Sequence, residues 1–188
     1  MTLLATDELP AELYGDTERP EVEARKVRAV LYFVRTDTEG RLAEPARLEE
    51  VRREVESRLP EVEVITRMLL EDPTTFSGND ANVRTAIPPD TQLLGVSVSD
   101  GLADVNLSAQ FENAAPGVFQ VLRVAQVVWT LTALPEVDAV RFRIHGAPQP
   151  VIDQLGVAHE RVGAGRYSQY APAGAGEVVV DEEPLGAD

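Results

Sequence analysis

The fold of this chain is decided by two stretches, TAIPPDTQLLGVSVSDGLADVNLSAQF at residues 85–111 and VLRVAQVVWTLTALPEVDAVRF at residues 121–142. The first stretch predicts strands over residues 92–99 and 102–111, because apolar residues alternate with polar ones on both sides of a Ser-Asp-Gly turn. A turn this short joins antiparallel strands, so the two strands form a hairpin. One face of this hairpin is expected to be buried and the other to be wet.

The second stretch predicts a helix followed by a strand. Residues 118–134 form the most apolar segment of the chain and end before Pro135, which cannot continue a helix. A helix that is apolar around so much of its circumference lies in the core, or meets both a sheet and another surface. Residues 137–144 then alternate, with apolar residues on one side and Arg141 and Arg143 on the other, which predicts a strand.

The N-terminal half predicts a strand and then a helix. Residues 27–34, VRAVLYFV, are rich in β-branched and aromatic residues and predict a strand. Residues 45–59 predict a helix, because Pro45 suits a first helical turn and apolar residues recur at spacings of three and four. The recurring residues are Leu48, Val51, Val55 and Leu59.

Charged residues of this predicted helix are spaced so that opposite charges meet one turn apart. The expected i,i+4 pairs are Glu49 with Arg53 and Glu54 with Arg58. A second helical piece follows after Pro60, with Ile65, Met68 and Leu69 on one face, and it ends at Asp72.

The predicted order of elements is strand, helix pair, two strands, helix, strand. This order indicates the α/β (α+β) class, with a small mixed β-sheet and about two to three helices packed on one face. A right-handed crossover is expected after the first strand if its neighbour is parallel. We expect an acidic extended leader over residues 1–24, a single domain over residues 25–170, and an acidic disordered tail over residues 171–188.

The charge of the chain is concentrated at its ends. Of the net charge of −15, residues 1–23 carry −6 and residues 177–188 carry −5. Such a chain is expected to avoid nucleic acid and anionic lipid surfaces, since it offers neither of them counterion release. The absence of cysteine excludes disulfides, thiolate zinc sites and a cysteine nucleophile. No apolar run is long enough to span a membrane, and no signal peptide is visible at Met1.

No residue of the chain stands out as catalytic, cofactor-binding or metal-binding. Neither His145 nor His159 has a second histidine, or a carboxylate three or four positions on, so no metal site is predicted. The loop SGNDAN, residues 77–82, lacks the ligand spacing and closing Glu of a calcium loop. No Gly-x-Ser-x-Gly motif anchors a hydrolase triad. We therefore predict a protein that is not an enzyme and has no cofactor; the competing hypothesis is a groove with carboxylates such as Asp80 or Asp104.

Four blocks of the sequence resemble the bacterial GerMN domain, the sporulation and spore germination domain, in the same order and at similar spacing. The blocks are TAIPPDTQLL from Thr85, DVNLSAQF from Asp104, AQVVWTLT from Ala125 and VDAVRF from Val137. VRAVLYFV resembles the first strand of that domain, so the resemblance covers roughly residues 26–147. The segment around Asp7-Glu-Leu-Pro resembles the stretch after the lipid-bearing Cys of GerMN lipoproteins.

The chain departs from the family pattern at three points. It has no lipobox Cys and no signal peptide. The predicted helix over residues 45–59 is longer and more charged than the family pattern. The last strand ends in His145-Gly-Ala where the family more often has Asp-Gly-Lys.

The resemblance implies an α/β domain with two helices on a small sheet and a non-catalytic role at the bacterial cell envelope. It also implies an extracytoplasmic location, with a lipid anchor in the full-length precursor as the only contact with the membrane. We expect an interaction or scaffold domain that binds a protein partner, or copies of itself, through a helix face or a sheet edge. The alternatives are a ligand-binding domain or hydrolase acting on cell-wall material, and a soluble cytoplasmic accessory protein. A signal peptide and lipobox encoded before Thr2 would decide for export.

Overall fold

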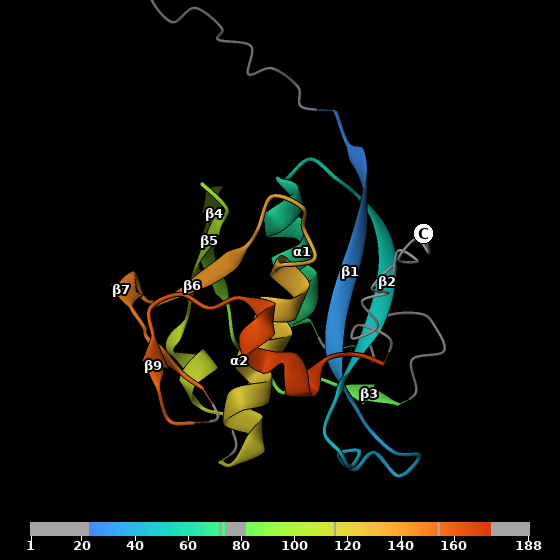
Figure 1. The fold of residues 1–188 in the computed structure, drawn as a ribbon. Coiled ribbons are helices and arrows are strands. Elements are labelled where there is room, and N and C mark those ends of the chain that lie inside the picture. The colour runs from blue at the N-terminus through green and yellow to red at the C-terminus, as the bar shows by residue number, and fades with distance from the viewer. Residues whose placement is uncertain (1–22, 72, 74–81, 115, 154, 174–188) are drawn as a thin grey trace, which may run out of the picture.

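Two β-sheets face each other across a pair of helices in this computed structural model, which describes residues 23–71, 73, 82–114, 116–153 and 155–173 (Figure 1). The strands are β1 (Arg25–Arg35), β2 (Leu48–Ser57), β3 (Val83–Arg84), β4 (Leu93–Ser99), β5 (Leu102–Leu107), β6 (Ala139–Ile144), β7 (Ala147–Pro148), β8 (Val151–Ile152) and β9 (Ala158–His159). The helices are α1 (Glu61–Leu70), α2 (Val118–Leu131) and the short 3-10 helices η3 (Ala109–Glu112) and η4 (Ala164–Tyr170). Within the described residues, none of the helices combines the length and the apolar character needed to cross a bilayer.

The second half of the chain folds largely as its alternating pattern predicts, but the second hairpin strand ends at Leu107, and residues 109–111, predicted as its continuation, lie in η3. β4 and β5 form the expected antiparallel hairpin, β6 follows α2, and β5 and β6 run parallel in a sheet of order β4-β5-β6-β7. Because the other pairs of this sheet are antiparallel, the sheet is mixed. The α+β class with a mixed sheet is therefore confirmed.

The first strand lies in a separate sheet of order β2-β1-β3, and not beside the hairpin. Both neighbours of β1 are antiparallel to it, so no parallel crossover follows the first strand. The helices α1 and α2 contact both sheets and lie between them (Figure 1). Each sheet thus has one face toward the helices, and together they enclose one cluster of buried apolar residues that extends from Val27 to Tyr167.

The prediction of a helix over residues 45–59 is wrong, because residues 48–57 form the strand β2. β2 pairs with β1 over its full length, from Val34 opposite Leu48 to Arg25 opposite Ser57. The spacing of three between Leu48 and Val51 is possible in a strand because the two side chains leave on opposite faces, and both are buried. Such two-sided burial at one end of a strand produces a helix-like period. Pro45 precedes the strand and follows Glu44 through a cis peptide bond.

The expected i,i+4 ion pairs of that helix are replaced by pairs within the sheet. Glu54 of β2 accepts hydrogen bonds from Lys26 at 3.1 Å and from Arg28 at 3.3 Å, both on β1. Glu49 pairs with Arg35 of β1 at 3.3 Å. Glu54 and Glu49 leave the strand on opposite faces, and Glu49 lies on the face of the buried Val51, so the charges of β2 do not form one solvated face.

The apolar helix α2 lies in the core, as one of the two predicted placements requires. Its buried residues include Gln126 and Thr130, both fully buried polar side chains on an otherwise apolar surface. Gln126 Nε2 donates to the Tyr32 carbonyl at 3.1 Å, and Thr130 Oγ1 accepts from the Tyr32 N–H at 3.0 Å. These bonds occupy the edge of β1 that β2 does not pair with, since β3 reaches only Val34 and Arg35.

The C-terminal part of the domain is anchored on α2 by Tyr167. Tyr167 is fully buried, and its carbonyl accepts a hydrogen bond from Trp129 Nε1 at 3.3 Å. Burial is the main cause that raises the pKa of the Tyr167 hydroxyl to about 12. The expected leader and tail fall almost entirely outside the described residues, so the domain boundaries at residues 25 and 170 stay predictions.

Candidate interaction surface

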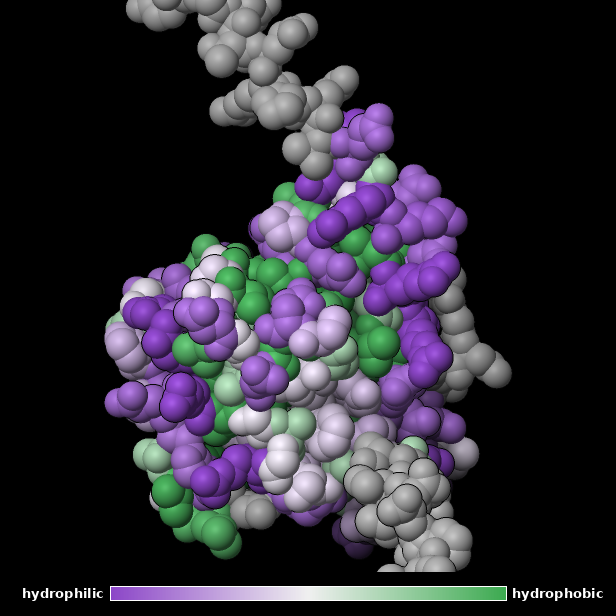
Figure 2. Space-filling model, turned by 45° about the horizontal axis from the view of Figure 1, so that its top comes forward, coloured by the Kyte–Doolittle hydropathy of each residue, from purple (hydrophilic) through white to green (hydrophobic). Residues whose placement is uncertain are grey.

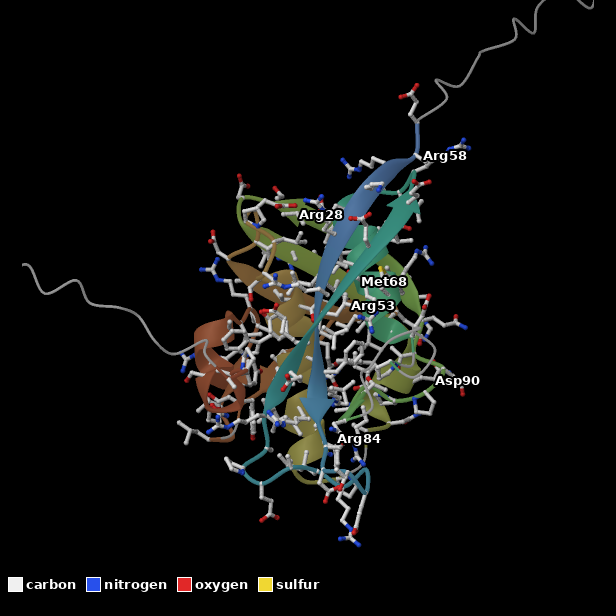
Figure 3. All side chains as sticks on the ribbon, turned by 90° about the vertical axis from the view of Figure 1, so that its right-hand side faces the viewer. Arg28, Arg53, Arg58, Met68, Arg84 and Asp90 are labelled. Carbon is white, nitrogen blue, oxygen red and sulfur yellow. The ribbon has the colours of Figure 1, made fainter. Side chains whose placement is uncertain are left out.

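The edges of the two large sheets differ in what covers them. One edge of β1 is paired with β2, and the other is occupied by α2 side chains. The free edge of β2 is lined by charge, because six of its ten residues are acidic or basic. Figure 3 looks onto this ribbon, with Arg28 and Arg53 on β1 and β2 and Arg58 just beyond the end of β2. Charged residues are a common means by which proteins prevent an edge strand from pairing with another chain.

The free edge of β4 lacks this protection. β4 reads LLGVSVS and contains no charged residue and no proline. Among the described residues, only β5 pairs with it, so its other edge has no strand beside it. The pairing is irregular between Leu93 and Gly95, which leaves Leu94 as an extra residue with 45% of its surface exposed. From Gly95 to Ser99 the strand is in regular register, about 17 Å of uninterrupted edge.

The outer face of the same sheet carries a cluster of charged residues. Asp104 of β5 lies directly opposite Arg141 of β6 in the parallel register. The Asp104 carboxylate accepts from Arg141 Nε at 2.7 Å and from Arg143 Nε at 2.8 Å. Arg141 Nη2 donates to the same carboxylate, and Arg143 Nη1 donates to the Gly146 carbonyl at 3.1 Å. Two guanidinium groups therefore share one largely buried carboxylate, whose side chain is 16% exposed.

This environment keeps Asp104 ionised. Burial alone would raise the pKa of Asp104, but the hydrogen bonds and positive charges of Arg143 and Arg141 outweigh burial and lower it. A general acid needs the opposite shift, toward neutral pH. The residue thus fits an ion-pair role, and the hypothesis of a hydrolase gains no support from it. Asp80, the other carboxylate of that hypothesis, lies outside the described residues.

The two histidines take structural positions. His145 has a positive φ of 47° in the turn after β6, as expected of a turn residue, and its Nε2 accepts from the Ala109 N–H at 3.3 Å. His159 Nε2 lies 2.9 Å from the Asp153 carboxylate, which also accepts the N–H groups of Leu155 and Val157. Of the described residues, no three His, Asp or Glu side chains lie close enough together to hold a metal ion. Residues 77–81 of the loop SGNDAN lie outside the described residues.

Two hollows beside α2 have no histidine in the part of their lining that the structure describes. One hollow of about 410 Å³ lies between η3, α2 and β8, and the half-buried Arg123 lines it. Arg123 lies 5.0 Å from the Phe111 ring centroid and also donates to the Phe111 carbonyl. The two carboxylates at this hollow are Glu112 and Asp153, and Asp153 is already bound to its own hairpin. A second hollow of about 360 Å³ lies beside Trp129, and its described lining includes one carboxylate, Asp138, and no histidine.

Exposed apolar side chains gather on the small hairpin of β8 and β9. They are Ile152, Leu155 and Val157. The hairpin lies at the lower left of Figure 1, and Figure 2 shows apolar surface on the same side of the molecule. The hairpin is an apolar surface separate from the uncharged edge of β4.

Sequence reasoning placed the side chains of Arg141 and Arg143 together but did not identify their partner. The alternation of residues 137–144 puts both arginines on one side, and the structure confirms this. Their convergence on Asp104 depends on the register of β5 with β6, two strands joined through α2. No sequence feature pointed to Arg161, which lines a hollow together with Arg141.

The chain belongs to the Germane family, described as "Sporulation and spore germination", whose sequence model matches residues 30–150. This match confirms the resemblance to GerMN domains. No curated protein sequence matches the chain.

Solved structures of similar fold include GerMN domains. The tandem GerMN domains of the sporulation protein GerM from Bacillus subtilis align with a TM-score of 0.51 at 23% identity, over 73% of this chain. The chain spans 46% of the length of that tandem structure. The first GerMN domain of the same protein aligns with a TM-score of 0.46 at 25% identity, over 65% of this chain and 86% of that one.

A Clostridium perfringens protein assigned as a lipoprotein also aligns, with a TM-score of 0.45 at 15% identity, over 74% of this chain and 89% of that one. Of these three alignments, only the one with the tandem GerMN domains supports the fold, and it supports no function.

Proposed function

We propose that this chain is a non-catalytic interaction domain of the GerMN type, and that a protein partner adds an extended segment as a strand on the free edge of β4. The observation that carries this proposal is the uncharged, regular edge of β4 over residues 95–99. Among the described residues, β4 pairs only with β5, so no strand lies at this edge. An added strand would receive main-chain hydrogen bonds along this edge, and alternate side chains would give specificity.

The contrast with β2 supports the choice of edge. A segment approaching β2 meets six charged side chains, whose desolvation opposes pairing. A segment approaching β4 meets Val, Ser and Gly, and the exposed Leu94 offers an apolar contact at the start of the strand. The helix face that the sequence also predicted as a docking surface is used internally, because α2 is buried between the sheets.

We favour a different protein over a second copy as the occupant. Two copies would each bring a net charge of −15, and a charge of that size keeps a protein monomeric through repulsion. A partner with less negative charge has no such cost at an uncharged edge. Self-association through β4 is an outcome that the experiment below distinguishes.

Membership of the Germane family supports an extracytoplasmic location for the domain, with a lipid anchor supplied by the full-length precursor. We expect the coding sequence to include a signal peptide and a lipobox before Thr2. We also expect the protein to be found in the membrane fraction of the cells. A coding sequence without either, with the protein in the cytoplasmic fraction, would favour the soluble accessory protein instead.

Site-specific photo-crosslinking tests the docking edge, because two exposed leucines provide a matched pair. Leu94 on β4 is 45% exposed, and Leu59 beyond the end of β2 is 42% exposed. A photoreactive phenylalanine analogue at position 94 is expected to capture one discrete partner in living cells, and the same analogue at position 59 is not. Equal capture at both positions, or none at position 94, contradicts the proposal. A crosslinked band at twice the mass of the chain identifies a second copy as the occupant.

A further inference from the structure

Three arginines lie together on the outer face of the sheet that contains β4. Two of them, Arg141 and Arg143, share Asp104 as described above. The third is Arg161, whose neighbour Val162 forms an antiparallel bridge with Val140, with N–H···O distances of 2.8 and 2.9 Å in the two directions. In an antiparallel bridge the adjacent residues, here Arg141 and Arg161, stand opposite each other on the same face. The two residues accordingly line one shallow hollow of about 470 Å³.

The cluster has more positive charge than its own carboxylates neutralise. Asp104 balances one of the three guanidinium groups, and Glu160, which lines the same hollow, balances at most one more. Arg161 is exposed and has no ion-pair partner in the part of the chain that the structure describes. This local excess stands out on a chain whose net charge is −15. A ligand for it carries negative charge.

Hydrogen-bond donors of the cluster remain available. Arg141 uses Nε and Nη2 for Asp104, and Arg143 uses Nε for Asp104 and Nη1 for Gly146. Across the described residues, no hydrogen bond involves Arg141 Nη1 or Arg143 Nη2. The shared carboxylate holds both planar groups in place, so little side-chain entropy is lost when they bind a further oxyanion.

The spacing of the arginines fits an extended peptide. Arg141 and Arg143 are two residues apart on one strand, about 7 Å, which is also the separation of alternate side chains in an extended segment. Carboxylates at alternate positions of a peptide could therefore meet these two residues in register. We propose that this face binds an acidic, extended segment of a partner protein, through carboxylates that contact Arg141, Arg143 and Arg161.

A long polyanion such as nucleic acid fits this face less well. The positive area is confined to a few residues, and a long polyanion would extend beyond them. A short acidic segment can end within the cluster. This inference does not depend on strand addition at β4, because β5 separates the β4 edge from Arg141.

Titration with synthetic peptides tests the inference. The probe is an N-acetylated peptide with alternating glutamates, Glu-Ser-Glu-Ser-Glu, and the control peptide carries glutamine in place of each glutamate. In the full chain, the Nε–Hε resonances of the three arginines are expected to shift on addition of the acidic peptide and not of the control. Arg161→Gln is expected to weaken binding about tenfold, the effect of losing one charge-assisted hydrogen bond. Arg28→Gln, which removes the same charge from a side chain 86% exposed on β1, is expected to change it less than twofold.

The outcomes separate the alternatives. Unchanged arginine resonances in the wild-type chain overturn the proposal, and so does equal weakening by Arg161→Gln and Arg28→Gln. Inorganic phosphate that binds as tightly as the acidic peptide also overturns it, because the face would then be a general anion site. Since Arg161 is exposed, its variant is expected to keep the unfolding midpoint of the wild type, and the wild-type resonances decide the matter if it does not.

Discussion

β2 and β4 are both edge strands in sheets of the same domain, yet their sequences treat the edge in opposite ways. β2 alternates glutamate and arginine between its few apolar residues, and these charges pair with one another and with β1. β4 has only Leu, Gly, Val and Ser. Since both strands pair correctly on their inner side, the difference concerns the outer side alone. An edge without charge is permissive for pairing, and in this molecule it belongs to the mixed sheet.

The part of the β1 edge that β3 does not reach shows a third solution, since α2 closes it with Gln126 and Thr130. Gln126→Leu is expected to have the largest effect on stability of the variants considered, about 3 kcal/mol. The substitution leaves the Tyr32 carbonyl and the Ala86 N–H, which Gln126 also binds, buried without partners. The shift in the urea midpoint of unfolding measures this loss.

Gln120→Leu is the matched control for that prediction, because Gln120 is exposed on the same helix. It is expected to change the unfolding free energy by less than about 0.5 kcal/mol. If both leucine variants shift the urea midpoint equally, the hydrogen bonds of Gln126 at the β1 edge do not stabilise the domain.

Asp104→Asn tests the sheet that contains β4, because Asp104 lies on β5, the strand between β4 and β6. The wild-type carboxylate is bound by two arginines, so its loss is expected to cost about 1.5 kcal/mol at neutral pH. Because the pKa of Asp104 is lowered in the folded state, its contribution is complete above the unfolded pKa of about 3.9 and disappears as the pH falls through the folded value. The difference between wild type and variant should therefore be largest near pH 7 and shrink below about pH 4. A difference that does not depend on pH would contradict this role.

Placing a charge on β4 should make its edge resemble that of β2. Gly95→Lys is expected to reduce crosslinking from position 94 about tenfold, since a lysine on an edge opposes strand addition. A Cβ added at position 95 meets no atom within 4 Å, so the stability of the domain should change by less than about 0.5 kcal/mol. Ser57→Lys at the end of β2 introduces the same charge on the other edge and is expected to leave crosslinking unchanged.

The sequence predicted an element correctly where one consistently buried face sets its pattern of apolar residues. The hairpin, α2 and β6 were predicted because each has one consistent buried face, or is buried all round. β2 was predicted as a helix because Leu48 and Val51 are buried on opposite faces of one strand, so the period of two is interrupted. No local signal distinguishes that pattern from a helical stripe; the pairing with the long strand β1 decides between them.

The candidate interaction surface was predicted less completely than the fold. A sheet edge was expected as a docking surface, but no sequence feature showed that β4, and not β1, would be at the edge. β4 lies at the edge because β1 belongs to a second sheet, where it pairs with β2. This second sheet was not predicted, because residues 48–57 were predicted as a helix. Asp104 was considered as a carboxylate of a possible groove. Its role in an ion pair was not predicted, because its partners come from β6, more than thirty residues further along the chain.

The smallest expected effect belongs to the solvent-exposed ion pairs of the β1 and β2 ribbon. Glu54→Gln removes the bonds to Lys26 and Arg28, all three of which are well exposed. Hydrogen bonds from these two bases lower the pKa of Glu54, so any contribution is present above its unfolded pKa and lost as the pH falls below it. Water and salt screen such pairs, so the urea midpoint should shift less than for Asp104→Asn and become indistinguishable from wild type in about 1 M salt. A larger shift than that of Asp104→Asn would mean that the charges on β2 hold the ribbon together, and do not merely keep its edge from pairing.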